Sequence, residues 1–84
     1  MAVTKYTELF SEQDWTRLKE QNSLPPRQAE VLRCVLGGMS DKQIAGATGI
    51  SVNTVRTHMS RLFTKFSSND RVELILSMFG QLRK

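Results

Sequence analysis

A set of polar side chains suited to contacting nucleic acid lies in one stretch of the sequence, between Gly49 and Phe66. In a helix, which turns by about 100° per residue, these side chains share one face. The face holds cations, amides and hydroxyls and no acid: Asn53, Arg56, Thr57, Ser60, Arg61 and Thr64. Such groups can hydrogen-bond the edges of bases and pair with phosphates, so the stretch predicts binding to DNA.

The same stretch has the features of a helix start and of a buried face. Ser51 can cap a helix by accepting from the backbone N–H groups of the first turn, and Ile50 precedes that cap with the spacing of a hydrophobic staple to Val55. Opposite the polar face lies an apolar stripe that must pack on a core: Val55, Met59, Leu62 and Phe66. We therefore predict a helix over residues 52–66.

A second, shorter helix is expected directly before this one. Ser40 and Gln43 have the spacing of a capping box, which predicts a helix over residues 41–48. Gly49 then permits a sharp turn, and two helices joined by so short a glycine turn cross steeply. The sequence thus predicts a helix-turn-helix arrangement.

Three further helices are expected around this pair. Ser11 and Asp14 have capping-box spacing and predict a helix over residues 12–21, with Trp15 and Leu18 on one side. A central, most buried helix is expected over residues 26–36, and a last helix over residues 70–82. No strand-like alternation is present, so the predicted fold class is all-α. Residues 1–10 show no clear period and are expected to be extended.

Composition bounds the protein to one small domain and excludes several functions. The chain has 84 residues and a net charge of +4, with a pI near 9.7, which suits an anionic partner. One cysteine and one histidine exclude an internal disulfide and disfavour a structural zinc site. Signal-peptide and membrane-spanning patterns are absent, as are phosphate loops and paired-carboxylate sites. We expect a cytoplasmic protein that is not an enzyme and binds no metal or cofactor.

Several other polar residues are expected to have structural roles. Cys34 is expected to be a small buried thiol, and His58 to be a packing histidine whose hydrogen bonds are satisfied. Arg27 and Glu30, three residues apart, should form an ion pair worth roughly a few tenths of a kcal/mol. The cations of residues 51–66 have no acid within that segment and are expected to be uncompensated.

Residues spread over positions 24–80 resemble the LuxR/GerE-type DNA-binding domain. The matching positions are Leu24, Arg27, Glu30, Val31, Leu32, Gly38, Ser40, Lys42, Ile44, Ala45, Ile50, Ser51, Thr54, Val55, Arg56, His58, Lys65 and Arg71. The resemblance implies a four-helix module, here with an additional short N-terminal helix, that binds promoter DNA as a dimer and regulates bacterial transcription. The resulting division is an N-terminal extension at 1–22 and a helix-turn-helix domain at 23–84. Pro25, Gln28, Thr48, Phe66 and Ser67 depart from the pattern; these departures bear on packing and leave the DNA-contacting face alone.

The expected contacts follow from where each side chain projects. Base edges should be met by Arg56, Thr57 and Ser60, with Asn53 and Arg61 at the margin. The phosphate backbone should be met by Lys42, Ser51, Thr54 and Lys65.

Self-association is expected through the last helix. The resemblance places Leu74, Ile75 and Met78 inward. An apolar seam of Val72, Leu76 and Phe79 then remains for a second copy to cover. The alternative is that the helix bearing Trp15 and Leu18 folds back over this seam.

Two alternatives remain open for the function. One is a promoter-binding module like region 4 of sigma factors, which has a similar Leu-Pro-Pro-Arg-Gln start and Gly-Ile-Ser-Val turn. The other is a protein-interaction module that has lost DNA binding. The expected partners are double-stranded promoter DNA and a second copy of the chain, with RNA polymerase as a further candidate, and the expected location is the nucleoid.

Overall fold

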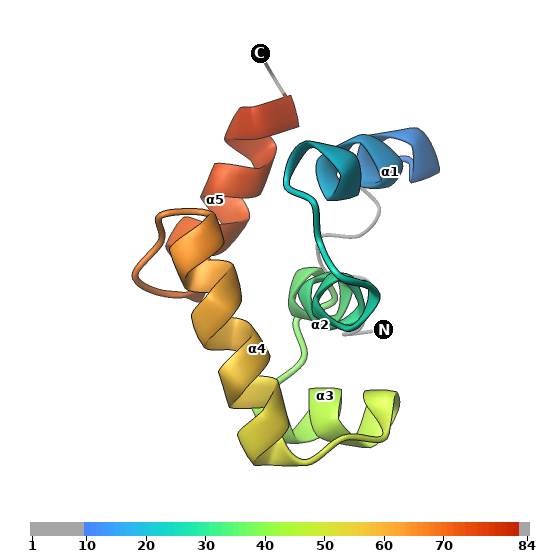
Figure 1. The fold of residues 1–84 in the computed structure, drawn as a ribbon, viewed down its shortest axis with the longest axis vertical. Helices are drawn as coiled ribbons and strands as arrows, with labels where there is room; N and C mark the ends of the chain where they lie inside the picture. The colour runs from blue at the N-terminus through green and yellow to red at the C-terminus, as the bar shows by residue number, and fades with distance from the viewer. Residues whose placement is uncertain (1–9, 83–84) are drawn as a thin grey trace.

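A computed structural model describes residues 10–82, which form five α-helices and no strand (Figure 1). The helices are α1 (Glu12–Gln21), α2 (Pro26–Leu36), α3 (Asp41–Thr48), α4 (Val52–Lys65) and α5 (Arg71–Leu82). The all-α prediction is therefore confirmed. The extended segment expected at residues 1–10 lies outside the described residues, apart from Phe10.

Side-chain caps set the helix starts where the sequence predicted them. The Ser11 and Ser40 hydroxyls accept from the third residue of α1 and α3, whose side chains accept in return, which completes both capping boxes. Ser51 caps α4 by accepting from the Thr54 N–H at 3.1 Å. The last helix begins one residue later than expected, because Asp70 is outside it and accepts from the Glu73 N–H at 2.9 Å.

Helix α2 lies at the centre of the domain, where it is seen nearly end-on in Figure 1 with the other helices around it. Its apolar side chains Val31, Leu32, Val35 and Leu36 are all buried. The predicted stripe of α4 packs in the same core, together with Ile44 of α3. Helix α4 is therefore fixed in the core along its apolar side and free along its polar side.

The N-terminal helix α1 belongs to this core. Trp15 is 5% exposed and Leu18 fully buried, so the predicted apolar side of α1 is turned inward. The end of α1 is also joined to the end of α5, since the amides of Asn22 and Gln81 donate to each other at 2.7 and 3.2 Å. These contacts hold α1 beside the C-terminal part of α5 (Figure 1).

Candidate nucleic-acid interface

The turn between α3 and α4 has the geometry expected of a helix-turn-helix. Three residues, from Gly49 to Ser51, separate the helices, which pack against each other. Gly49 has a φ of 74°, in the left-handed region where a side chain causes strain. Thr48, which departs from the family pattern, places its hydroxyl on the Ile44 carbonyl at 2.7 Å. The turn is thus short, and the last residue of α3 before it is held by a hydrogen bond within its own helix.

The predicted reading face of α4 is on the surface. Its members are all exposed, whereas Val55, Met59 and Leu62 on the opposite side are buried: the exposed residues are Asn53, Arg56, Thr57, Ser60, Arg61 and Thr64. The Thr57 hydroxyl donates to the Asn53 carbonyl at 3.1 Å, so it offers a partner its lone pairs and not its proton. The structure therefore brings the predicted base-contacting residues onto one solvent-facing strip.

Arg56 departs from the expectation that the cations of this segment are uncompensated. Its Nε lies 3.7 Å from Oδ2 of Asp41, at the start of α3, and the same carboxylate also pairs with Arg71 of α5. The expectation is wrong for Arg56 because crossing of the two helices brings an acid from outside the segment to it. Arg56 and Arg71 follow Asp41 by 15 and 30 positions, and no local pattern in the sequence shows that they lie beside it. Sequence reasoning therefore missed Asp41.

The predicted phosphate contacts fall into two places. Lys42 is exposed at the start of α3, and Ser51 and Thr54 lie at the start of α4, with their hydroxyls 2.9 Å apart. Lys65 is at the other end of α4, about 20 Å away at 1.5 Å per residue, where its Nζ donates to the Ser23 carbonyl at 3.2 Å. Lys65 is therefore separate from Lys42, Ser51 and Thr54, and it is hydrogen-bonded to the loop between α1 and α2.

His58 makes fewer hydrogen bonds than expected. His58 is half-buried, and its Nδ1 has no hydrogen-bond partner among the described residues. The expectation that its hydrogen bonds are met is therefore wrong for this atom. Gln28, one of the departures from the family pattern, has a buried Oε1 in the same condition.

The last helix divides into an inner and an outer strip, as predicted for most of its residues. Leu74 and Met78 are fully buried and Ile75 is half-buried, whereas Val72 and Leu76 are 66% and 63% exposed. The alternative, in which α1 covers the seam, fails at these two exposed residues because α1 turns its apolar side to the core.

Phe79 is the member of the seam that is covered. It is half-buried, and its ring centroid lies 4.8 Å from that of Phe10. Val72 and Leu76 thus form the open part of the seam.

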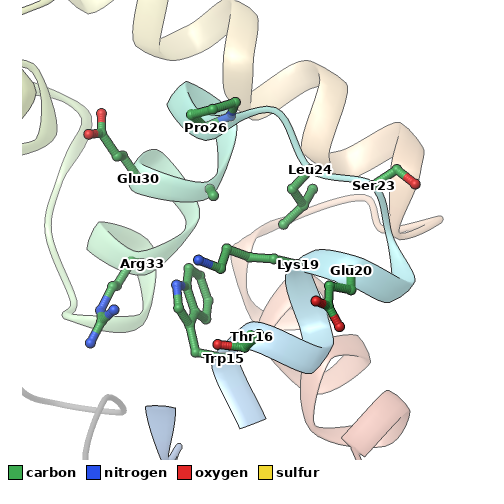
Figure 2. A pocket seen from close by; sticks show the side chains of 10 residues that line it. Trp15, Thr16, Lys19, Glu20, Ser23, Leu24, Pro26, Glu30 and Arg33 are labelled. Carbon is green, nitrogen blue, oxygen red and sulfur yellow. The ribbon is translucent and has the colours of Figure 1, made fainter. Parts of the chain in front are cut away.

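A groove lies between α1 and α2. Figure 2 shows Trp15 between the two helices, with Lys19 across it and Leu24 from the joint nearby. The Arg33 guanidinium lies 5.6 Å from the Trp15 ring centre and donates to Glu12 at 2.6 Å, and this hydrogen bond lowers the pKa of the Glu12 carboxyl.

Two of the four charged residues that line this groove, Glu30 and Arg33, form ion pairs within the protein. Glu30 forms the predicted ion pair with Arg27 at 2.8 Å, which is confirmed. Cys34, close to Glu30 on α2, is half-buried, and burial raises the pKa of its thiol. Among residues 10–82 no cluster of histidine, cysteine and acidic side chains could hold a metal ion. No helix in that range has the length and apolar content to cross a membrane.

Two capped helices, a left-handed glycine between them and an exposed polar face on the second define a helix-turn-helix domain. The chain belongs to the luxR family of bacterial regulatory proteins, whose GerE domain matches residues 22–78. The resemblance found in the sequence is thereby confirmed, in preference to the sigma-factor alternative. This places the protein among bacterial regulatory proteins.

Several staphylococcal response regulators are similar to this chain. The response regulator protein VraR from Staphylococcus aureus (strain NCTC 8325 / PS 47) is 34% identical over 56 residues, and those from Staphylococcus saprophyticus and Staphylococcus epidermidis are equally similar. The matched region is 67% of this chain and 27% of each relative, so this chain spans about a quarter of their length. No solved structure matches the chain.

Proposed function

We propose that this protein regulates transcription by binding double-stranded promoter DNA sequence-specifically, with α4 in the major groove. The observation that carries the proposal is the solvent-facing strip of α4, which lacks acids and stands on the second helix of a capped helix-turn-helix. Its opposite side is anchored in the core, so the strip can enter a groove without unfolding the domain.

The side chains have two kinds of role in this proposal. Arg56, Thr57 and Ser60 meet base edges, since they project from the first turns of α4, with Asn53 and Arg61 beside them. The phosphate contacts come from the starts of α3 and α4 and, at the far end, from Lys65. Lys65 would have to leave the Ser23 carbonyl to reach DNA, so we expect it to contribute least.

The proposed assembly is a dimer on a roughly palindromic site, joined through α5. Val72 and Leu76 are the large apolar side chains exposed on the described residues, and they are four positions apart on one helix. Phe79 is expected to contribute at the edge, because Phe10 already covers part of it.

The experiment begins with selection of bound fragments from a randomised duplex pool, which supplies the best site. Wild-type protein, Arg56→Ala and Lys42→Ala are then titrated with this site and with a scrambled duplex at several salt concentrations. Arg56→Ala should cost about 1–3 kcal/mol on the best site and relax the preference at one base pair. Lys42→Ala should weaken both duplexes alike and make the salt slope shallower by about one unit.

Two results would change the proposal. If Arg56→Ala lowers both affinities equally and leaves the base preference intact, Arg56 contacts a phosphate and the reading face is wrongly assigned. If the wild-type protein binds no duplex at low salt, the DNA role fails and the protein-interaction alternative is favoured.

A further inference from the structure

An ion-pair network links the reading helix to two other helices. The Asp41 carboxylate at the start of α3 pairs through Oδ1 with Nη2 of Arg71 and through Oδ2 with Nε of Arg56, the latter at 3.7 Å. Arg71 comes from the first turn of α5 and Arg56 from the second turn of α4. A carboxylate therefore stands beside the arginine that the proposed function assigns to base reading.

Asp41 is fixed independently of Arg56. Arg71 holds it from one side and is itself anchored, because its Nη1 donates to the Met39 carbonyl at 2.9 Å. The carboxylate also lies in the first turn of α3, where the helix dipole favours a negative charge. The Asp41 side chain is 30% exposed, whereas that of Arg56 is 67% exposed. Asp41 is thus the more buried member of the pair and Arg56 the more exposed one.

We propose that Asp41 is a positioning residue that orients Arg56 for base reading and so sets sequence discrimination; this inference rests on the proposed function. Contact through Nε leaves the two terminal amino groups of Arg56 to meet guanine O6 and N7. Restricting a long side chain before binding also lowers the entropy that binding costs.

The charge of Asp41 acts in the same direction. A carboxylate repels phosphate, so a guanidinium held beside it is disfavoured from pairing with the DNA backbone and is left for the base edge. The hollow next to the pair is lined by Met59, Ser60 and Phe63 together with the three charged side chains, of which Asp41 is the acid. The Asp41 carboxylate thus both favours base reading by Arg56 and disfavours contacts of Arg56 with the DNA backbone.

The test compares Asp41→Asn with Asp70→Asn in the full chain. Both substitutions remove one acid at a helix start and leave the helix caps in place, since Ser40 caps α3 and an amide oxygen at position 70 can still accept from the Glu73 N–H. They differ in that Asp41 pairs with Arg56, whereas the Asp70 carboxylate accepts from the backbone of its own helix. Discrimination is the affinity ratio between the selected duplex and a duplex changed at the base pair that Arg56→Ala identifies. Asp41→Asn should lower this ratio about two- to fivefold, the size expected for an exposed ion pair, while Asp70→Asn leaves it unchanged. In the Arg56→Ala background, Asp41→Asn should have no further effect on the ratio.

A second readout uses the free protein and separates positioning from a purely structural role. The Nε–H resonance of Arg56 should show restricted motion by heteronuclear relaxation. Asp41→Asn should make it as mobile as that of Arg61, which forms no ion pair among residues 10–82. Arg56 as mobile as Arg61 in the wild-type protein overturns the inference, as does an unchanged ratio in Asp41→Asn. A wild-type protein that discriminates while Asp41→Asn keeps its ratio refutes only this inference. Absence of any discrimination in the wild-type protein refutes the proposed function as well.

Discussion

Leu18 is the residue at which the importance of α1 can be tested most directly. It lies before the family-matched region at residues 22–78, yet its side chain is fully buried among core residues. Leu18→Ala should therefore lower the free energy of unfolding by about 2–5 kcal/mol, as for other fully buried leucines. For 84 residues the whole free energy of unfolding is about 4–13 kcal/mol at 0.05–0.15 kcal/mol per residue. The substitution should thus remove a large part of the stability.

The assay is urea unfolding followed by circular dichroism, with a thermal scan beside it. A loss of about 3 kcal/mol corresponds to a Tm decrease of about 12–24 °C for a domain of this size. Leu76→Ala is the matched control, because it makes the same change on α5 at a residue that is 63% exposed. In dilute protein that control should cost less than about 0.5 kcal/mol.

Equal, small effects of the two substitutions would refute the reasoning. Such a result would mean that residues 1–22 are an appendage whose packing contributes nothing to the domain at 23–84. The proposed division of the chain predicts only that α1 is additional to the family's module. Leu18→Ala therefore distinguishes an added helix that stabilises the fold from one that merely rests on it.

Two further predictions concern α5 and the thiol. Leu76→Arg should weaken dimers and cooperative binding to a palindromic duplex while leaving the monomer helical; identical monomer sedimentation before and after the change would refute the seam. Because burial raises the pKa of Cys34, its alkylation by iodoacetamide at pH 8 should be slower in the native protein than in urea. As the pH rises above about 9.0, the unfolded chain loses the Cys34 proton before the folded chain does, so this thiol should lower the free energy of unfolding there. The decrease that is due to the thiol should be absent in Cys34→Ala. Equal alkylation rates in the two states would contradict this view of Cys34.

Local patterns in the sequence predicted the helices almost to the residue. Ser11, Ser40 and Ser51 each mark a helix start because a cap depends on a side chain and the backbone three residues further on. The buried stripe of α4 follows in the same way from helical periodicity. The fold class and the exposed polar face of α4 could therefore be predicted, since both depend on short-range order.

Contacts between distant segments could not be predicted in this way. The pairing of Asp41 with Arg56 and Arg71, and the bond from Lys65 to Ser23, depend on how the helices cross. Each changes the interpretation of a residue whose type alone suggested a free cation. The family resemblance implied roles for the positions but carried no information on these ion pairs or on this hydrogen bond.

The arrangement of α5 suggests that dimerisation and base reading are coupled. Arg71 reaches inward to Asp41, while the next residue, Val72, is exposed on the open part of the seam. A second copy covering Val72 and Leu76 would lie against the turn of α5 that holds Asp41, and shielding from water strengthens an ion pair. Strengthening that pair would fix Asp41 more firmly and, through it, Arg56. The coupling must also act in the reverse direction, because linkage between two binding events is reciprocal.

Leu76→Arg should then lower not only cooperative affinity but also the single-site discrimination that depends on Asp41. In Asp41→Asn this second effect should disappear. Leu76→Arg protein that loses dimers yet keeps the wild-type discrimination ratio on a half-site would show that the two properties are independent.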